Sequence, residues 1–436
     1  MTTLAEVRLW GRTIGAVSIE DGADYAAFQY TPEFAASGIE ISPITMPLGN
    51  QVQVFSTLPR NTFHGLPGLL ADSLPDKFGN ALIDAWLAAQ GRTPASFNPV
   101  ERLCYTGARG MGALEFVPAI GPALQPAKKI NVDTLVQLAS DVLGRRGDFA
   151  ASFADAKRAN ALQDILRVGT SAGGARAKAV IAWNRNTNEV RAGQIATDAG
   201  FDYWLLKFDG VAGNQDKELE DPQGYGVIEY AYSLMAQAAG VSMSESRLLE
   251  ENGRRHFMTR RFDRTAGGAK LHAQSLCALA HYDFNAPGAY AYEQAFLAIR
   301  TLGLPMAAVE QQFRRMVFNL IARNQDDHVK NIAFLMDQQG NWSLSPAFDM
   351  TYSYNPSGAW TAQHQMTING KRDGFSMEDL RACAKNALMK RGRAGAIIEE
   401  VRAAVAQWPA IAKRARVAEP WRKQIQSNLR LILPSK

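Results

Sequence analysis

The spacing of apolar residues changes once along this chain, and that change limits the folds available to it. Up to about residue 262, runs such as VRLWGRTIGAVSIEDG and DYWLLKFDG alternate apolar and polar residues between glycine turns, which is typical of β-strands. From about residue 290 the runs are nearly all helical, for example YEQAFLAIRTLG and VEQQFRRMVFNLIARN. A β-rich part followed by an α-rich part predicts an α+β protein with two lobes.

The length of 436 residues is too great for one compact core, so we expect several packed units. A Pro-interrupted connector, GPALQPAKK at 121–129, marks the end of the first unit, which is β-rich and opens with a hairpin across Gly11. We place the three units at residues 1–125, 126–262 and 263–436.

The composition is that of an ordinary globular protein, with 47% hydrophobic and 20% charged residues. We find no basic flank with a short apolar run at the N-terminus and no window near the ~18 apolar residues of a membrane span. We therefore expect a cytoplasmic protein that does not enter a membrane. The isolated Cys104, Cys277 and Cys383 support neither a disulfide framework nor a zinc cluster. A net charge of +5 would tolerate an anionic ligand or nearby DNA but is weak evidence for either.

The densest group of reactive side chains is the octet NQDDHVKN at 324–331, which follows a helix and precedes a predicted hairpin at 332–344. Phosphoryl transfer by a kinase needs a carboxylate that accepts the proton of the substrate hydroxyl, and an amide and a second carboxylate that hold Mg²⁺. In kinases the base and the amide lie five residues apart, as Asp326 and Asn331 do. The second acid follows a short hairpin, as Asp349 does. This order of residues indicates a phosphoryl-transfer site.

The octet alone leaves other interpretations open. A polar octet after a helix is usually a solvated turn, although the hairpin and Asp349 weigh against that interpretation. A zinc site at Asp326 and His328 would lack a third and a fourth ligand at suitable spacing. We expect His328 to make a structural hydrogen bond that shapes the loop, and we expect Asp327 to tolerate replacement by Asn.

A kinase also needs groups that bind the nucleotide phosphates. The segment ILRVGTSAGGARAKAVIAWN predicts a strand, a glycine-rich turn and a second strand, so that backbone amides can approach a triphosphate. It is not a Walker A sequence, because Lys178 is followed by Ala179 in place of Ser or Thr. In the next strand, DYWLLKFDG, Lys207 lies among apolar residues, where a lysine is costly to bury unless it meets an anion. The alternative is an edge strand whose lysine extends into water.

Two further segments fit this arrangement. Glu229, on the following predicted helix, is a candidate to orient Lys207, and the simpler interpretation is that it faces solvent. Residues 258–262, MTRRF, occupy the place where a kinase chain crosses between its lobes and pairs with adenine. The candidate nucleotide contacts there are Arg260, Arg261 and Phe262.

Together these segments resemble the HipA family, bacterial serine/threonine kinase toxins of type II toxin-antitoxin modules. The matching motifs follow the family order over nearly the whole chain: DSLPDKFG (72–79), YTGARGMGALEF (105–116), SAGGARAK (171–178), LLKF (205–208), RRFDR (260–264), NQDDHVKN (324–331) and SPAFDM (345–350). The resemblance implies a two-lobed protein-kinase-like fold with an additional β-rich N-terminal subdomain and a mostly α-helical C-terminal lobe.

The resemblance also implies roles for individual residues. Asp326 would be the catalytic base, and Asn331 and Asp349 would bind Mg²⁺. The implied ATP contacts are Gly173, Gly174, Ala175, Arg176, Lys178, Lys207, His328, Lys330, Asn331 and Asp349. Ser171, in the glycine-rich loop, would be phosphorylated by the protein itself. Its phosphate would carry a charge of about −1.5 to −2 and would repel the ATP phosphates or pull the loop away, so we expect phosphorylation to inactivate the protein.

The sequence thus predicts an ATP- and Mg²⁺-dependent serine/threonine protein kinase. The resemblance implies a toxin that phosphorylates a translation protein such as an aminoacyl-tRNA synthetase, and that binds a HipB-like helix-turn-helix antitoxin and, through it, operator DNA. Two alternatives stay open. One is a non-catalytic kinase-fold corepressor that acts with a DNA-binding antitoxin, and the other is a kinase for a small molecule.

Overall fold

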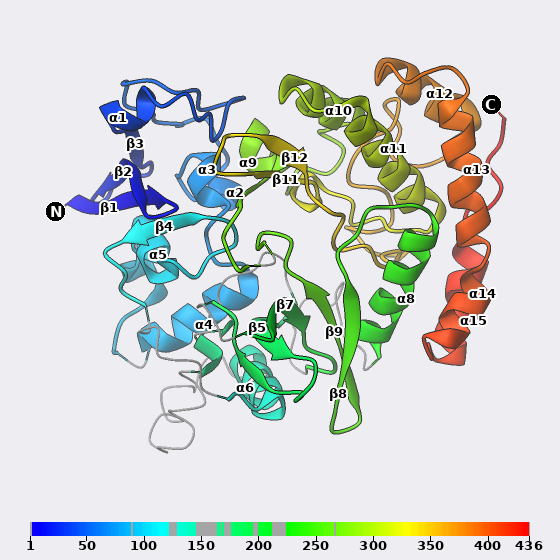
Figure 1. The fold of residues 1–436 in the computed structure, drawn as a ribbon, viewed down its shortest axis with the longest axis horizontal. Coiled ribbons are helices and arrows are strands. Elements are labelled where there is room, and N and C mark those ends of the chain that lie inside the picture. The colour runs from blue at the N-terminus through cyan, green and yellow to red at the C-terminus, as the bar shows by residue number, and fades with distance from the viewer. Residues whose placement is uncertain are drawn as a thin grey trace.

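The computed structural model describes residues 2–88, 90–121, 129–144, 164–166, 168–169, 176–194, 199–211, 224–265 and 267–435. Within these ranges the chain forms three antiparallel sheets, and helices dominate its C-terminal part (Figure 1). The predicted glycine-rich loop falls mostly outside the described residues. The strands and helices that flank it are described.

The first sheet lies at the N-terminal end of the molecule (Figure 1). Its strands follow the order β3-β2-β1-β4, with β1 (Thr2–Leu9), β2 (Arg12–Glu20), β3 (Ala27–Tyr30) and β4 (Leu114–Val117). The predicted hairpin across Gly11 is confirmed, because β1 pairs with β2 and the turn holds Trp10 and Gly11 at φ of 51° and 78°. The helices of this region are α1 (Pro32–Ala35), α2 (Arg60–Phe63), α3 (Gly68–Ala71), α4 (Lys77–Ala88) and α5 (Pro99–Thr106).

The second sheet carries both predicted phosphate-binding lysines. Its order is β6-β5-β7-β9-β8, with β5 (Lys178–Asn184), β6 (Val190–Ala192), β7 (Phe201–Lys207), β8 (Ser246–Glu251) and β9 (Arg254–Arg260), and its helices are α6 (Val132–Gly144) and α8 (Tyr225–Ala238). Trp204 and Leu206 of β7 pack with Leu135 of α6 and with Phe78 and Leu82 of α4 in one apolar cluster. Helix α4 therefore belongs to the core of this lobe, although it precedes the expected boundary near residue 125, which remains a prediction.

One predicted strand is wrong. Residues 164–166, which we expected to begin a strand before the glycine-rich turn, are helical, and so is Val168. Ile165 and Val168 are buried in the cluster that contains α4 and α6. A short apolar run fits a buried helical turn as well as a buried strand, and only the tertiary neighbours decide between them.

The third sheet and the C-terminal helices form the second lobe. The sheet has the order β10-β11-β12, with β10 (His272–Ser275), β11 (Ala333–Met336) and β12 (Trp342–Leu344), so the hairpin predicted at 332–344 is confirmed. The helices are α9 (Leu276–Ala280), α10 (Tyr292–Thr301), α11 (Met306–Ile321), α12 (Met377–Asn386), α13 (Arg393–Val405), α14 (Trp408–Arg414) and α15 (Glu419–Asn428). Helices α10 to α15 gather on the side of the molecule opposite the first sheet (Figure 1).

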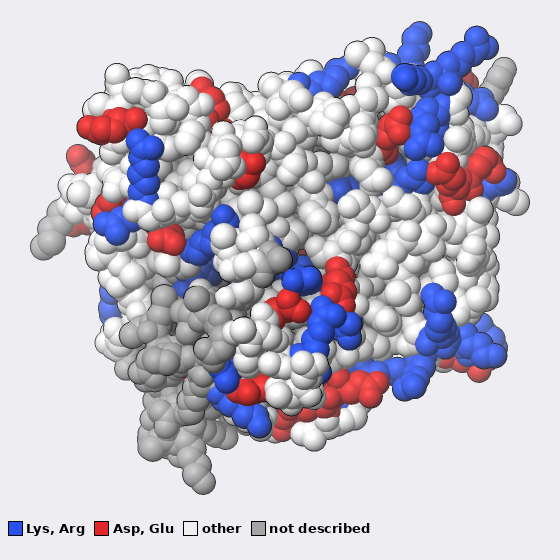
Figure 2. All heavy atoms as spheres, in the orientation of Figure 1, with Lys and Arg blue, Asp and Glu red and all other residues white. Residues whose placement is uncertain are grey.

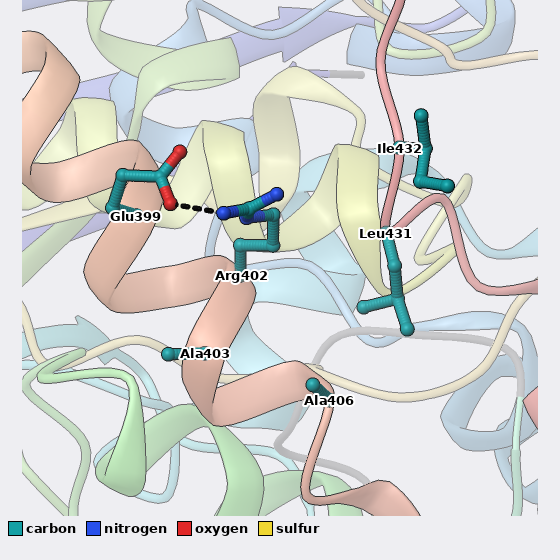
Figure 3. A pocket seen from close by; sticks show the side chains of 6 residues that line it. All are labelled: Glu399, Arg402, Ala403, Ala406, Leu431 and Ile432. Atoms are coloured by element: carbon teal, nitrogen blue, oxygen red, sulfur yellow. Dashed lines mark hydrogen bonds and ion pairs between the residues drawn. The ribbon is translucent and has the colours of Figure 1, made fainter.

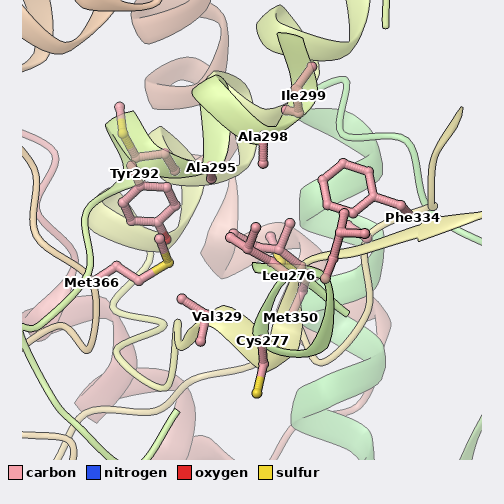
Figure 4. Packing of buried hydrophobic residues seen from close by; sticks show 14 of the residues in the cluster. Leu276, Cys277, Tyr292, Ala295, Ala298, Ile299, Val329, Phe334, Met350 and Met366 are labelled. Carbon is pink, nitrogen blue, oxygen red and sulfur yellow. The ribbon is translucent and has the colours of Figure 1, made fainter. Parts of the chain in front are cut away.

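The core of this lobe fixes the segments that carry the predicted site. Val329 from the polar octet and Met350, next to Asp349, lie in the same apolar cluster as Leu276 and Phe334 (Figure 4). Val329 and Met350 expose only 1% and 4% of their surface. The two polar segments are therefore attached by buried apolar residues to one rigid core.

The predicted α+β fold, with a β-rich N-terminal subdomain, a body of two lobes and a mostly helical C-terminal lobe, is confirmed. Cys104, Cys277 and Cys383 are buried and unpaired. Among the described residues, each helix is too short or too polar to cross a lipid bilayer.

Candidate active site

The polar octet forms a closed loop after helix α11. The chain leaves the helix at Ile321 and ends the octet in a single 3₁₀ turn, Val329–Asn331. The side-chain Nδ2 of Asn331 donates to the backbone oxygen of Asp326 at 2.8 Å. This bond holds the predicted base and the predicted metal-binding amide at a fixed separation.

Asp349 is brought to this loop by backbone pairing. Ser353 donates its N–H to the oxygen of Arg323 at 3.0 Å and accepts from the N–H of Gln325 at 3.1 Å. Asn324 Nδ2 also donates to the backbone oxygen of Asp349 at 3.4 Å. Asp349 itself has a φ of 52°, a left-handed conformation that is uncommon outside glycine and that Asp and Asn tolerate best. Its side chain is thus aimed by a backbone geometry that few residues adopt.

Lys207 connects the two lobes at the same place. Its Nζ lies 2.6 Å from Oε1 of Glu229 on α8 and also pairs with Oδ1 of Asp349. Burial alone would lower the pKa of Lys207, but the carboxylates of Asp349 and Glu229 raise it above the ordinary value. Burial would likewise raise the pKa of Asp349, and Lys207 with Lys178 lowers it. Both groups are therefore charged near neutral pH.

Glu229 is a buried partner of two cations, with only 1% of its surface exposed. Its second oxygen, Oε2, lies 3.3 Å from Nη1 of Arg176, whose guanidinium stands 4.4 Å from the ring centre of Tyr225. The solvent-facing interpretation of Glu229 is wrong. Glu229 therefore holds Lys207 and Arg176 close to each other.

Asp326 is accessible and weakly held. Its side chain is 29% exposed, and its Oδ1 accepts from Nε1 of Trp360 at 2.7 Å and lies 3.8 Å from Nε2 of His328. Burial raises the pKa of Asp326, and the carboxylates of Asp349 and Asp327 add to this effect. A carboxylate with a raised pKa and open access has the properties of a general base.

Asp327 has the opposite environment. It is 1% exposed, and it accepts from Tyr292 Oη at 2.8 Å, His364 Nδ1 at 2.7 Å and the backbone N–H of Gln365 at 2.8 Å. Nε2 of His364 lies 3.1 Å from the guanidinium of Arg430, and because a guanidinium can only donate, Nδ1 is the ring nitrogen that donates to Asp327. Burial would raise the pKa of Asp327, but His364, Gln365 and Tyr292 lower it.

These contacts argue against the expectation that Asp327 tolerates Asn. An Asn side chain offers one acceptor oxygen to three donors, so at least one donor would lose its partner in a buried place. Asp327 is buried and fixes the conformation of the loop, whereas Asp326 is partly exposed to solvent.

Within the described part of the chain, the His328 side chain makes no hydrogen bond of the kind expected. Its Nδ1 is buried without a hydrogen-bond partner among the described residues. The ring lies between two aromatic rings, 5.4 Å from Phe284 and 6.4 Å from Trp360. Lys330 places its ammonium 5.0 Å from the ring centre of Phe284. Phe284 therefore contacts both residues, and His328 lies beside Asp326.

Lys178, a predicted ATP contact, stands opposite Lys207 in the register of β5 and β7. Its Nζ lies 3.2 Å from Oδ2 of Asp76, and both side chains are 3% exposed. Burial lowers the pKa of Lys178 and raises that of Asp76, and their mutual attraction opposes both shifts.

The remaining predicted residues divide into two groups. In the crossing segment, Arg261 is bound to Asp263 at 2.6 Å, Arg260 to Asp202 at 2.8 Å, and Phe262 packs on Phe348. Their side chains serve the structure, and their contact with adenine stays a prediction. Outside the described residues lie Ser171, Gly173, Gly174 and Ala175.

Three residues of the site were missed by the sequence interpretation: Trp360, His364 and Asp76. Trp360 and His364 lie in an irregular stretch between β12 and α12, where no periodic pattern marks a side chain. Asp76 belongs to the motif DSLPDKFG, and the match of this motif to the family is the sequence signal that could identify it as a site residue.

The ligand set fits Mg²⁺. Asn331 offers an amide oxygen, since its nitrogen is bound to Asp326, and Asp349 offers a carboxylate. Mg²⁺ prefers oxygen ligands and is commonly held by one or two protein groups together with substrate phosphates. Among the described residues, no group of three or more His, Cys, Asp or Glu side chains forms a metal site. A metal here would therefore depend on phosphate oxygens.

Two other surface features are separate from this site. A hollow between α13 and the C-terminal segment is lined by Glu399, Arg402, Ala403, Ala406, Leu431 and Ile432, none of them a predicted site residue (Figure 3). Lys and Arg side chains gather along the edge that carries the C-terminal helices, with Asp and Glu among them (Figure 2). This mixed edge has no uniform basic stripe on the visible face.

Two family models match the chain. The model described as HipA N-terminal domain matches residues 5–117, and the model described as HipA-like C-terminal domain matches residues 170–408. The second match spans more than half of the chain.

Solved structures give two similarities. A chain of the Shewanella oneidensis MR-1 toxin-antitoxin complex of HipA, HipB and operator DNA has a TM-score of 0.67 at 19% identity, over 98% of this chain and 94% of that chain. The Helicobacter pylori proinflammatory kinase CtkA has a TM-score of 0.37 at 12% identity, over 59% of this chain and 90% of that chain. No curated protein sequence matches the chain. The first similarity shows a shared fold.

Proposed function

The chain belongs to the HipA family, and on that premise we propose that it is an ATP- and Mg²⁺-dependent serine/threonine protein kinase that acts as the toxin of a type II toxin-antitoxin module. The observation that carries the proposal is the ion pair between Lys207 and Asp349. It joins the lysine-bearing sheet to the lobe that holds Asp326 and Asn331. A scaffold protein would have no need to keep these groups together.

In the proposed reaction, each residue has a separate task. Asp326 accepts the proton of the substrate hydroxyl, and its raised pKa makes it a better proton acceptor than an ordinary aspartate. Lys207, oriented by Glu229, binds phosphate oxygens. Asn331 and Asp349 hold Mg²⁺, which when bound neutralises negative charge on the phosphates. His328 and Lys330 border the nucleotide.

The regulation and partners follow the family. We propose that Ser171 is autophosphorylated and that its phosphate inactivates the enzyme by repelling the ATP phosphates. The Shewanella oneidensis complex contains HipB and operator DNA, which supports a HipB-like antitoxin and, through it, DNA as partners of this chain. The proposed protein substrate is a translation factor such as an aminoacyl-tRNA synthetase, in the cytoplasm.

A phosphoproteome after induced expression tests the proposal. Cells expressing the wild-type chain are compared with cells expressing Asp349→Asn, which keeps the size of the side chain and removes its charge. The proposal predicts new phosphoserine or phosphothreonine on a translation protein in wild-type cells only. Identical phosphoproteomes, with repression of an operator still intact, would favour the corepressor. A phosphorylated metabolite without a phosphorylated protein would favour a small-molecule kinase.

A further inference from the structure

The motif DSLPDKFG, residues 72–79, sends both of its acids into other parts of the molecule. Asp72 accepts from the backbone N–H and the Oγ of Ser275 at 2.7 and 2.8 Å. Ser275 is the N-cap of α9, so Asp72 fixes the start of that helix. The second acid of the motif, Asp76, points toward the lysine-bearing sheet.

Asp76 binds with both of its oxygens. Oδ1 accepts from the backbone N–H of Gly79 at 2.6 Å, which caps the first turn of α4. Oδ2 lies 3.2 Å from the ammonium of Lys178. The cap orients the carboxylate, and the carboxylate in turn holds the ammonium.

Apolar packing fixes α4 against the strand that carries Lys178. Phe78 and Leu82 are fully buried in the cluster that also contains Ala179 and Ile181 of β5. Helix α4 also packs closely against Gly169. Any side chain at that position would clash with Leu82, because its Cβ atom would lie 2.6 Å from Cδ1 of Leu82. The backbone segments that carry Asp76 and Lys178 are therefore held next to each other by a rigid core.

The charges explain why Lys178 needs this acid. Lys178 and Lys207 are direct cross-strand partners on β5 and β7, and like charges in this position repel each other. Lys207 pairs with Glu229 and Asp349, Lys178 pairs with Asp76, and the charge of Asp349 also acts on Lys178. Without Asp76, the buried ammonium of Lys178 would lose its paired carboxylate and would tend to lose its proton. A neutral lysine has little attraction for phosphate.

We propose that Asp76 is a positioning residue of the nucleotide site, which keeps Lys178 charged and beside Lys207 so that the two lysines bind the ATP phosphates together. This inference rests on the proposed kinase function and adds a contribution of helix α4 to it. Glu229 orients one lysine from within the kinase-like body, and Asp76 orients the other from the segment that precedes the expected domain boundary.

Binding and docking are then linked. If Asp76 must be in place for the phosphates to bind, bound phosphates must stabilise the docked α4 by the same factor. Amide hydrogens of residues 77–88 should therefore exchange more slowly when nucleotide is bound. A lysine that merely filled space would give no such coupling.

The test measures binding of AMP-PNP, a non-hydrolysable ATP analogue, and of adenosine, which lacks phosphates, both with Mg²⁺. The variant is Asp76→Asn, whose side-chain oxygen can still cap α4. The matched control is Glu115→Gln, because Glu115 also precedes the expected boundary and pairs with a lysine beyond it, Lys270, at 2.7 Å and away from β5. We expect Asp76→Asn to weaken AMP-PNP at least 10-fold and adenosine less than 2-fold, and Glu115→Gln to change neither by more than 2-fold.

Five results would overturn the inference. If Asp76→Asn binds AMP-PNP within 2-fold of the wild-type affinity, the carboxylate of Asp76 has no role in phosphate binding. Equal losses for AMP-PNP and adenosine, or an equal loss in Glu115→Gln, indicate general damage to docking. If Asp76→Asn fails to fold, hydrogen exchange of the wild-type chain decides, and unchanged exchange at 77–88 with saturating AMP-PNP is the contrary result. A wild-type chain that binds no AMP-PNP overturns the proposed kinase function itself, and this inference with it.

Discussion

The catalytic loop and the two lysine strands hold their charges in opposite ways. Asp326 and Asp327 are bound by donors such as the Trp360 indole and the Gln365 amide. Lys207 and Lys178 are bound by carboxylates, three in all, from separate parts of the chain. Neutral donors fix the shape of the loop and leave its negative charge for proton transfer. Carboxylates fix the lysines and limit the repulsion between them.

The difference predicts how the two regions respond to change. In the loop, Asp326 is partly exposed and Asp327 is buried. Replacing Asp326 should therefore lower turnover, and replacing Asp327 should lower the stability of the protein. In the strands, each lysine is part of a buried ion-pair network, so removing one partner should weaken phosphate binding and also lower the stability of that lobe.

The largest effect is expected for Asp326→Asn. The amide cannot accept a proton, and loss of a general base lowers turnover by a factor of about 10² to 10⁴. The melting temperature should stay close to wild type, because the side chain is partly exposed and Asn can still accept from Trp360. Phosphate transfer at saturating ATP and Mg²⁺ is the measurement, and turnover within 2-fold of wild type would exclude Asp326 as the base.

Lys207→Met comes next. The change removes the cation shared by Glu229 and Asp349 and one charge-assisted bond to phosphate, which together should weaken AMP-PNP about 10- to 100-fold. Calorimetry measures the affinity, and Lys270→Met is the control, since Lys270 is also paired and partly buried but lies outside the site. Equal affinities in both variants would show that Lys207 has no special role.

Asp327→Asn should affect stability more than chemistry. Three donors converge on Asp327, and leaving one of them without a partner costs about 1 to 3 kcal/mol of unfolding free energy. Urea unfolding at neutral pH measures this loss of stability. Asp326→Asn is the control, because it makes the same Asp-to-Asn substitution at the neighbouring position. If Asp327→Asn is as stable as wild type and loses turnover like Asp326→Asn, the roles of the two acids are reversed.

The smallest effect concerns pH. The raised pKa of Asp326 means that it becomes protonated at a higher pH than an ordinary aspartate, so turnover should fall early on acidification. The pKa of Asp327 is lower in the folded protein than in the unfolded chain, where an aspartate has a pKa of about 3.9. The carboxylate therefore stabilises the fold at pH values above about 3.9, and this stabilisation is lost as the pH falls through the lower pKa of the folded state. Turnover should therefore decline before the protein unfolds. Coincident declines in rate and in circular dichroism would contradict this order.

The sequence predicted those site residues that lie close together in the chain at a regular spacing or that interrupt a clear apolar pattern. Asp326, Asn331 and Asp349 were predicted as a group because their spacing around a hairpin is regular. The environment of Lys207 was predicted from a single charge in an apolar strand. In contrast, Trp360 and His364 lie in an irregular segment, and the partnership of Asp76 with Lys178 joins two segments whose proximity depends on the packing of α4. Such contacts are determined by tertiary packing and cannot be predicted from the local pattern of apolar and polar residues.

The same limit explains the fold. The hairpins across Gly11 and at 332–344 have strong turn signals and were predicted correctly, whereas the apolar run at 164–168 carried no signal that separates strand from helix. The assignment of α4 to the core of the lobe that contains β5 and β7 also required the structure, since the helical pattern of α4 gives no information on the partner it packs against.

The most direct test of the central claim is transfer of the γ-phosphate of labelled ATP by the purified wild-type chain, with Mg²⁺ and with a chelator. The account predicts labelled phosphoserine or phosphothreonine, on the chain or on an added lysate protein, that disappears when Mg²⁺ is removed. A folded chain that transfers no phosphate to any protein in the presence of Mg²⁺ would contradict it.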